Sequence, residues 1–407
     1  MTTPRLISNR ADATNTYPSS GSATMFTFRV PFRAMVAASS LRLVYTNKQF
    51  VNTTGEGNPA DTVTVKASIE LSDGTLWPVF FGGVREKALA PGESVTSDAV
   101  PVALAKNDLF FVRSRPLVDT LGKKWGTAGA PLKGGYLGGA ARSGQDLTDS
   151  GADTAFPTAN TVPFGPAAIL GIQEAPAPVT GIVVGSSTAY GSGDVNDNDG
   201  DYGFVSRTLA ANGIPHFRLS APGLAVSHIL GATAADVPGK TAYHRALIEL
   251  TRPTHAFISL GNNDVHKSTF TLADNKAALL RYFDFFAGQG LKLIASTVTP
   301  RTTGTWTTLV GQTKSAAVVN TKRHAFNDWL RTAPHSALVD VWDVAAIAQE
   351  PTDPDLWRVD GGAWTNDGTH MSAIGHSSVA RALAPQARSV ELLYTDANRL
   401  RGANAVH

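Results

Sequence analysis

The feature that most constrains the fold of this chain is a change in hydrophobic period near residue 175. Before it, four segments alternate apolar with polar side chains, as half-buried β-strands do, at 27–30, 41–45, 63–71 and 76–81. After it, short apolar segments alternate with helical patterns. The predicted strands lie at 181–185, 216–219, 255–260, 291–296 and 337–342. The predicted helices lie at 202–211, 242–250, 272–287, 316–332 and 372–389. The chain therefore combines two architectures.

The first half predicts an antiparallel β-sandwich of jelly-roll type, with a tight turn at residues 72–75 between two of its strands. The second half predicts an α/β domain with a five-stranded parallel sheet and helices on both faces. A Gly- and Ala-rich segment of weak periodicity spans residues 117–165, and a stiff EAPAP linker follows at 174–178. We place the boundary there, giving domains of residues 1–175 and 176–407, and expect residues 174–407 to fold alone.

Composition excludes several classes of function. The chain has no cysteine, which rules out disulfides, thiolate metal sites and a cysteine nucleophile. A net charge of +2 without a basic run makes nucleic acid an unexpected partner. The sequence holds no membrane-span candidate and no signal peptide, so we expect a soluble chain. The sequence leaves its location undecided, and secretion and association with a virion are both options. All ten histidines lie from His216 onward, so a histidine base must come from the second half.

Four short motifs follow predicted strands, where a parallel α/β sheet places its chemistry. They read GSSTAYG at residues 185–191, APG at 221–223, GNND at 261–264 and DGTH at 367–370. Together they offer a nucleophile, a backbone donor, a side-chain amide and an acid–base pair. Acyl transfer from an ester requires this set of groups.

The order and spacing of these motifs resemble the SGNH hydrolases, the serine esterases also called the GDSL family. The resemblance implies a flavodoxin-like, three-layer domain with strand order 2-1-3-4-5. It assigns a triad of Ser187, Asp367 and His370, in which His370 is the base and Asp367 orients it. It assigns an oxyanion hole to the Ser187 N–H, the Gly223 N–H and the amide of Asn263, and it implies neither a cofactor nor a metal.

Each motif also has a simpler interpretation. GSS alone is typical of a turn without chemistry or of a phosphate-binding loop, and Ser186 stands where the family has the aspartate of Gly-Asp-Ser. An Asp three residues before a His is also a helix N-cap, and Asn-Asn-Asp is a common turn. The co-occurrence of all four motifs in order favours the enzyme. We expect His376 to be a structural residue behind the loop.

Loop residues near the same edge are weaker candidates. Arg301 lines the cleft or joins a surface ion pair, and the tryptophans Trp306, Trp357 and Trp364 either stack on a ligand or anchor their loops. Of these we take Arg301, Trp306 and Trp364 as substrate-binding candidates. The acidic run DVNDNDGD at 194–201 fails calcium-loop spacing, because its sixth and twelfth positions hold Asp199 and Val205 instead of Gly and Glu. We expect a solvated loop there and no metal site.

The sequence thus predicts a carboxylic ester hydrolase that acts through an acyl-serine intermediate. Our hypothesis for the substrate is a short acyl ester, above all O-acetyl on a carbohydrate, with the β-sandwich as an accessory or substrate-binding domain. Lipid or aryl esters are the alternative within the enzyme class. Outside it, the alternative is a structural or binding protein of a virion or cell surface with a vestigial hydrolase domain. The oligomeric state is left open.

Overall fold

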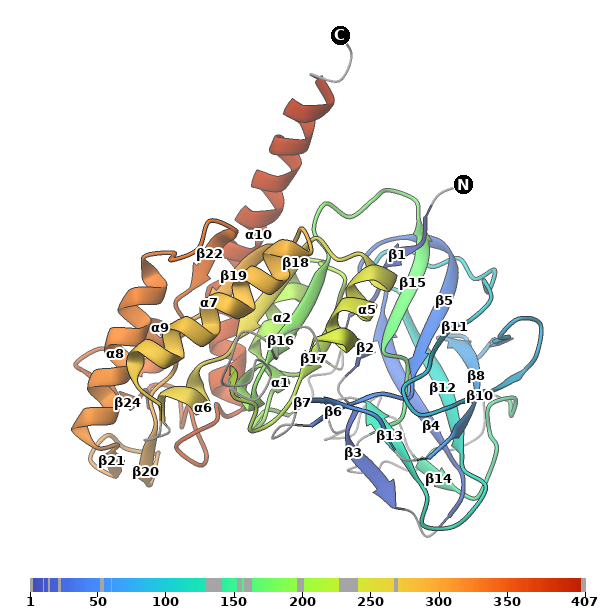
Figure 1. Cartoon of the computed structure of the whole chain (residues 1–407), viewed down its shortest axis with the longest axis horizontal. Helices are drawn as coiled ribbons and strands as arrows, with labels where there is room; N and C mark the ends of the chain where they lie inside the picture. Colours follow the sequence, from blue (N-terminus) through green and yellow to red (C-terminus); the bar gives the residue numbers. More distant parts are fainter. Residues whose placement is uncertain are drawn as a thin grey trace.

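The computed structural model describes residues 3–9, 11–13, 15–20, 23–51, 55–59, 61–128, 141–151, 156, 163–195, 201–226, 241–266 and 270–403. A β-rich part and an α/β part lie side by side, and the C-terminal helix extends away from both (Figure 1). None of the described helices is both long and apolar enough to cross a bilayer.

The N-terminal part is an antiparallel β-sandwich, as predicted. One sheet has the order β1 (Arg5–Leu6), β15 (Ala168–Gln173), β5 (Ala38–Thr46) and β11 (Ser94–Thr96). The other has the order β10 (Glu86–Leu89), β8 (Val63–Leu71), β12 (Leu109–Leu117), β4 (Phe26–Arg33) and β14 (Ala141–Ser143), with β9 (Leu76–Pro78) beside β8. Among the described residues, four further strand pairs form small sheets: β3 (Asn15–Ser20) with β13 (Lys124–Ala128), β6 (Gln49–Val51) with β7 (Gly55–Gly57), β20 (Thr302–Gly304) with β21 (Gln312–Lys314), and β23 (Gln349–Glu350) with β24 (Asp353–Trp357).

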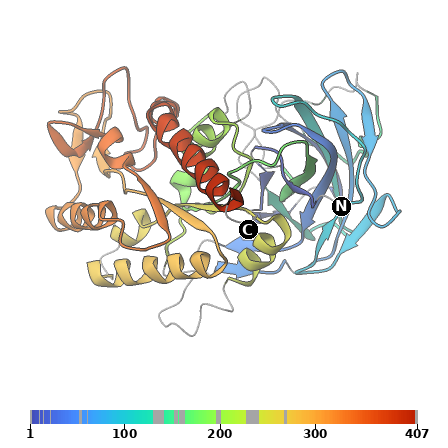
Figure 2. The same cartoon turned by 90° about the horizontal axis from the view of Figure 1, so that it is seen from above.

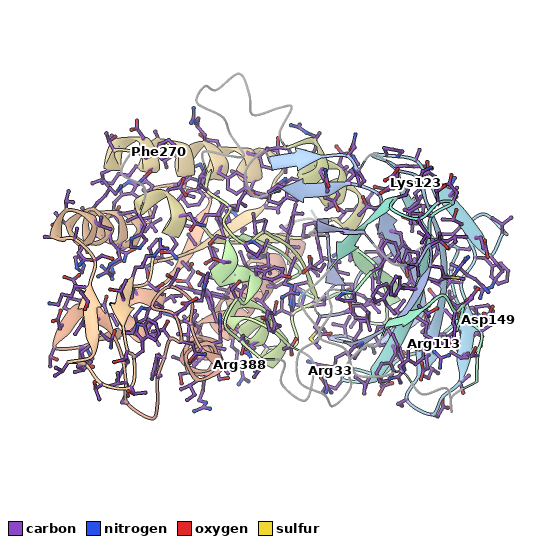
Figure 3. All side chains as sticks on the ribbon, turned by 90° about the horizontal axis from the view of Figure 1, so that it is seen from below. Arg33, Arg113, Lys123, Asp149, Phe270 and Arg388 are labelled. Carbon is purple, nitrogen blue, oxygen red and sulfur yellow. The ribbon has the colours of Figure 1, made fainter. Side chains whose placement is uncertain are left out.

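The sandwich is held by apolar burial between its sheets and by ion pairs on one face. Tyr45 of β5 reaches across to Ser114 of β12, with 2.6 Å between the two hydroxyl oxygens. Arg113 is fully buried, and its guanidinium pairs with Glu70 at 2.7 Å. Arg113 and Asp149 both lie in this part of the molecule, and Asp149 pairs with Lys66 at 2.7 Å (Figure 3). The charges on this face are therefore matched within the fold.

The C-terminal part contains a parallel sheet whose five predicted strands are confirmed. In spatial order they are β17 (His216–Ser220), β16 (Gly181–Gly185), β18 (His255–Ser259), β19 (Lys292–Ser296) and β22 (Leu338–Trp342). Numbered along the chain, this is the order 2-1-3-4-5. The order reverses beside β16, and the carboxyl ends of the strands at such a point form the usual binding crevice of an open α/β sheet.

Helices cover both faces of the parallel sheet, because successive strand side chains point to opposite faces. Ile182 and Val184 join the apolar core beneath α5 (Ala242–Thr251), α7 (Leu272–Gly288) and α8 (Ala317–Arg331). Val183 joins a second core beneath α2 (Phe204–Ala211), α9 (Val344–Ala348) and α10 (Ala373–Ala403). Figure 2 shows α7 and α10 on opposite sides of the sheet. The remaining elements are short: α1 (Ser187–Tyr190), α6 (Asn262–Val265), β23 (Gln349–Glu350) and β24 (Asp353–Trp357).

A sixth strand, missed by the sequence interpretation, comes from the N-terminus. β2 (Ala11–Asp12) pairs in parallel with Phe217 and Arg218 of β17. The Asp12 carboxylate meets the Arg218 guanidinium at 2.9 Å, and both side chains are almost wholly buried. From the β6–β7 hairpin, Glu56 accepts hydrogen bonds from the backbone N–H of Tyr243 and of His244 at the start of α5.

The apolar core runs without a break from the sandwich into the α5–α7 side of the parallel sheet. Residues 174–407 alone would lack β2, Asp12 and Glu56, and they would expose this shared core. The structure therefore argues against our expectation that this segment folds independently. The division at residue 175 itself stays a prediction.

We expect Asp12→Ala to lower the free energy of unfolding by about 3–5 kcal/mol, because it strands a buried guanidinium without its partner. Asp360→Ala is the matched control, since Asp360 pairs with Arg358 at an exposed site worth at most about 1 kcal/mol. Urea unfolding of both variants measures the difference. Equal, small losses would show that β2 contributes little to the stability of the parallel sheet.

Candidate active site

The nucleophile turn follows β16 at the carboxyl edge of the sheet. Gly185 is required there, because a Cβ at this position would lie 2.6 Å from the carbonyl oxygen of Ser259. Ser186 is extended, and Ser187 begins the short helix α1. Gly191 ends this helix with φ of 93°, a conformation that favours glycine, and its N–H returns to the Ser187 carbonyl at 3.0 Å. Ser187 thus sits at a helix start, where backbone N–H groups have no intrahelical acceptor.

The acid–base loop is held by a compact set of hydrogen bonds. The Nδ1 atom of His370 lies 2.6 Å from one carboxylate oxygen of Asp367. The other oxygen accepts the backbone N–H groups of Thr369 and His370, each at 2.8 Å. Burial raises the pKa of Asp367, but the hydrogen bonds from His370 and Thr369 more than offset this and hold that pKa below its usual value. Asp367 is therefore the charged partner of the His370 ring.

Two contacts bring the nucleophile turn and the acid–base loop together. A Cβ at Gly193 would clash with the carbonyl oxygen of Met371, the residue after His370, and Gly193 has a φ of 89°, so only a glycine lets the two segments approach this closely. His376 is fully buried; its Nδ1 accepts the backbone N–H of Phe204 at 3.0 Å, and its Nε2 lies 3.2 Å from the carbonyl oxygen of Ser192. This pattern requires a neutral ring that donates through Nε2, in keeping with a pKa lowered by burial. His376 thus holds the nucleophile turn in place through its hydrogen bond to the Ser192 carbonyl.

Two other buried histidines lie at the wrong edge of the sheet to act as the base. His216 and His255 are the first residues of β17 and β18, and both pair with Gly181 at the start of β16. Burial lowers the pKa of each to about 4. They are neutral structural residues at the amino ends of the strands, opposite to the end that carries Ser187.

The two predicted oxyanion-hole segments are neighbours in space. Gly223 has a φ of 79° in the turn after β17. The side-chain amide of Asn263 donates to the carbonyl of Leu224, the next residue, at 2.9 Å. Asn262 is a separate case: it is buried, and its Oδ1 has no hydrogen-bond partner in the part of the chain that the structure describes. Asn263, not Asn262, is therefore beside Gly223, while the roles of Ser187, Gly223 and Asn263 as oxyanion donors stay predictions.

The weaker substrate-binding candidates separate into two groups. Arg301 donates from Nε to the Thr369 hydroxyl at 3.1 Å, so it lies against the acid–base loop. Trp306 is half-buried, and its indole nitrogen would lie 2.9 Å from a Cβ at Gly368 in the same loop. Trp364 is only 5% exposed and donates to the Asp360 carbonyl at 2.9 Å, which leaves it little surface for a ligand. The structure therefore favours the loop-anchor interpretation for Trp364.

Two residues brace this loop: Thr365, which sequence interpretation missed, and Trp357, for which it left open an anchoring role. The Thr365 hydroxyl donates to the His370 carbonyl at 2.7 Å and accepts the Gly368 N–H at 2.9 Å. The indole N–H of Trp357 donates to the Gly368 carbonyl at 3.1 Å. No motif marks such residues in one sequence, because a threonine or tryptophan near a turn is common and its partners are set by tertiary contacts.

The acidic run after the nucleophile turn is described at both ends, while residues 196–200 lie outside the described residues. Asp194 is buried and accepts hydrogen bonds from the Gly203 N–H at 2.8 Å and from the Arg207 Nε at 2.9 Å. Asp201 accepts from the Asn9 amide at 2.8 Å. The carboxylates of Asp194 and Asp201 therefore both accept hydrogen bonds from protein donors. Among the described residues, no group of three metal-ligating side chains lies close together.

We expect turnover to survive EDTA unchanged, because the predicted activation of Ser187 by proton transfer to His370 needs no metal and the Asp194 carboxylate is held by Arg207. The measurement is the initial rate on an aryl acetate before and after chelation and dialysis. A loss that calcium restores would instead identify the 194–201 run as a functional cation site.

Comparison with known proteins bears on these motifs directly. Residues 183–377 match the GDSL-like Lipase/Acylhydrolase family, a span that begins in β16 and ends just past His376. No curated protein sequence matches the chain.

Among solved structures, the chain resembles a carbohydrate esterase family 2 enzyme with a carbohydrate-binding domain from Corynascus thermopiles, at 14% identity and a TM-score of 0.38, over 96% of this chain and 99% of the other. It also resembles a family 2 carbohydrate esterase from Cellvibrio japonicus, at 11% identity and a TM-score of 0.34, over 96% and 99%. A putative acylhydrolase from Bacteroides fragilis matches at 13% identity and a TM-score of 0.35, over 54% and 92%.

Proposed function

Because residues 183–377 form a GDSL-like lipase/acylhydrolase domain, so that this chain is a serine esterase of the SGNH type, we propose that it removes short acyl groups, above all acetyl, from a carbohydrate. Within this proposal Ser187 is the nucleophile, His370 the general base and acid, and Asp367 the residue that orients His370. The observation that carries the assignment is the 2.6 Å Asp367–His370 pair, packed through Gly193 against the turn that bears Ser187.

The first half of the reaction forms the acyl-enzyme. The Ser187 oxygen attacks the ester carbonyl carbon while Nε2 of His370 takes the hydroxyl proton, and the carbonyl oxygen becomes an oxyanion. N–H groups of Ser187 and Gly223 and the amide of Asn263 stabilise that charge, which exists only in the transition state and intermediate. The bond to the sugar oxygen then breaks, and His370 returns the proton to this leaving oxygen.

The second half repeats these steps with water. His370 deprotonates a water molecule as it attacks the acyl carbon, the oxyanion forms again in the same place, and the bond to Ser187 breaks as the serine regains its proton. Asp367 stays ionised throughout and stabilises the imidazolium of His370. The products are a short carboxylic acid and a free sugar hydroxyl, and the enzyme returns to its starting state.

Two features support a carbohydrate ester over a lipid. Half-buried Trp306 lies beside the acid–base loop, and a partly exposed indole offers an apolar surface to the face of a sugar ring. A β-sandwich is fused to the esterase domain through β2 and shares its core, which gives a polymeric substrate a second surface to contact. The alternative, a vestigial hydrolase, fits poorly with a triad loop whose hydrogen bonds are fully formed.

A substrate panel tests the proposal. We expect the full chain to cleave p-nitrophenyl acetate faster than the butyrate and octanoate, and to release acetate from acetylated xylan or a related O-acetylated glycan. Preference for the octanoate would support the lipid esterase, and turnover of the aryl esters without any glycan would support the aryl esterase. Absence of turnover on every ester would support the vestigial hydrolase.

Trp306→Ala should raise the KM for an acetylated oligosaccharide by roughly tenfold, as loss of an aromatic contact does, while p-nitrophenyl acetate is cleaved as before. Trp77→Ala is the matched control, a half-buried tryptophan of β9 in the sandwich. Steady-state kinetics on both substrates make the comparison. Equal effects of Trp306→Ala on both substrates would assign it to loop structure instead of sugar binding.

A further inference from the structure

A small cavity separates three segments of the active-site edge. It is bounded by the carboxyl ends of β16, β18 and β19. Its lining includes Ser186 and Thr188, which flank the nucleophile, Asn262, which precedes Asn263, and Thr299, which lies two residues before Arg301. The space open to the centre of a water molecule is about 10 Å³, close to the room that one buried water needs.

Four polar atoms of this lining have no hydrogen-bond partner among the described residues. They are the hydroxyl oxygens of Ser186, Thr188 and Thr299 and the amide oxygen of Asn262. Ser186 is fully buried, and the other three are between 2% and 7% exposed. Native interiors leave few such groups unsatisfied, because each loses its hydration without compensation. Four around one cavity indicate a shared ligand.

The lining selects the chemistry of that ligand. Every lining side chain is apolar or neutral and polar, so an anion or divalent cation would find no opposite charge. The Asn262 oxygen can only accept a hydrogen bond, while the three hydroxyls either donate or accept. A water molecule offers two donors and two acceptors, which matches this set of atoms, and it fits the volume.

We propose that the cavity binds one water molecule, and that this water joins the nucleophile turn, the Asn262–Asn263 turn and the Thr299 loop into one rigid unit. Ser186, Thr188, Asn262 and Thr299 are its ligands and act as positioning residues. Ser187 is bonded along the backbone to Ser186 and Thr188, and Asn263 to Asn262. A shift of the water therefore moves the nucleophile and an oxyanion donor relative to one another. This positioning role rests on the function proposed above.

Isosteric variants test the role of the water. Thr188→Val and Thr299→Val each remove one ligand oxygen, and we expect each to lower kcat roughly 10- to 100-fold with KM nearly unchanged. Since both act through one water, the double variant should be little worse than either single one. Thr299→Ser should restore most of the rate. Thr251→Val is the control, because Thr251 is a fully buried threonine whose hydroxyl bonds to the Leu247 carbonyl in α5.

Unchanged kcat in both single variants would overturn the positioning role, as would losses that multiply in the double variant. Loss of activity that follows unfolding, and that Thr299→Ser fails to restore, would show a purely structural role and overturn it as well.

A crystal structure of the full chain tests the site itself and does not depend on activity. We expect one water within hydrogen-bond distance of the Ser186, Thr188 and Thr299 hydroxyls, displaced or absent in Thr299→Val. An empty cavity would overturn the proposal. So would a bound monovalent cation, revealed by a rate that changes when sodium replaces potassium. If the wild-type chain cleaves no ester while the water is present, the proposed function fails and the water site stands.

Discussion

Ser187→Ala and His370→Ala should each abolish ester turnover while leaving the fold intact. In the mechanism proposed above, Ser187 supplies the atom that bonds to the acyl carbon, and His370 moves the proton in both halves of the reaction. In a serine hydrolase these residues act as a unit, so losing either costs on the order of 10⁶ in kcat, and the double variant is little worse than either single one. The measurement is the steady-state rate on p-nitrophenyl acetate, with urea unfolding to confirm the fold.

Ser186→Ala is the matched control, since it removes the neighbouring hydroxyl. It should keep measurable turnover with at most the moderate loss expected of a water ligand. Full activity in Ser187→Ala together with inactivity in Ser186→Ala would place the nucleophile one residue earlier.

Asn263→Ala should lower kcat by about 10²–10³, the usual effect of losing one oxyanion donor. KM should barely change, because the donor acts on charge that forms only in the transition state. In the wild-type chain the Asn263 amide donates to the carbonyl of Leu224, the residue after Gly223. The variant therefore also loses a contact between the two predicted oxyanion segments.

Asn262→Ala tests the register of this motif. Asn262 lines the cavity, whereas Asn263 is the residue that bonds to Leu224, so the loss of activity in Asn262→Ala should be smaller than that in Asn263→Ala. A larger loss of kcat in Asn262→Ala, with Asn263→Ala close to wild type, would show that Asn262 and not Asn263 is the oxyanion donor.

The fold could be predicted where a segment carries its own period. β16 lies at the predicted residues, and the other four parallel strands differ by a residue or so, because a short segment with apolar residues, bounded by turns, is typical of a buried strand. β2 could not be predicted: two residues have no period, and their pairing with β17 depends on Arg218, 206 positions away. The helix α10 extends to Ala403, beyond the predicted end at 389, and continues past Pro385.

The candidate site likewise has residues that a local motif predicts and residues that only tertiary packing brings together. Asp367 and His370 are three residues apart, so one loop holds both and a local motif reveals them. The His376–Phe204 bond joins residues 172 apart, and the cavity gathers ordinary serines and threonines from separate strands. Nothing in one sequence marks such residues, since their partners are set by the packing of the sheet.

The central claim is that Ser187 is the nucleophile of a serine esterase, and covalent labelling tests it most directly. The full chain is treated with a fluorophosphonate, digested, and the modified residue located by tandem mass spectrometry. We predict one adduct on Ser187, formed at the rate at which activity is lost and absent in His370→Ala. An adduct on Ser186, or inactivation without modification of Ser187, would contradict the account.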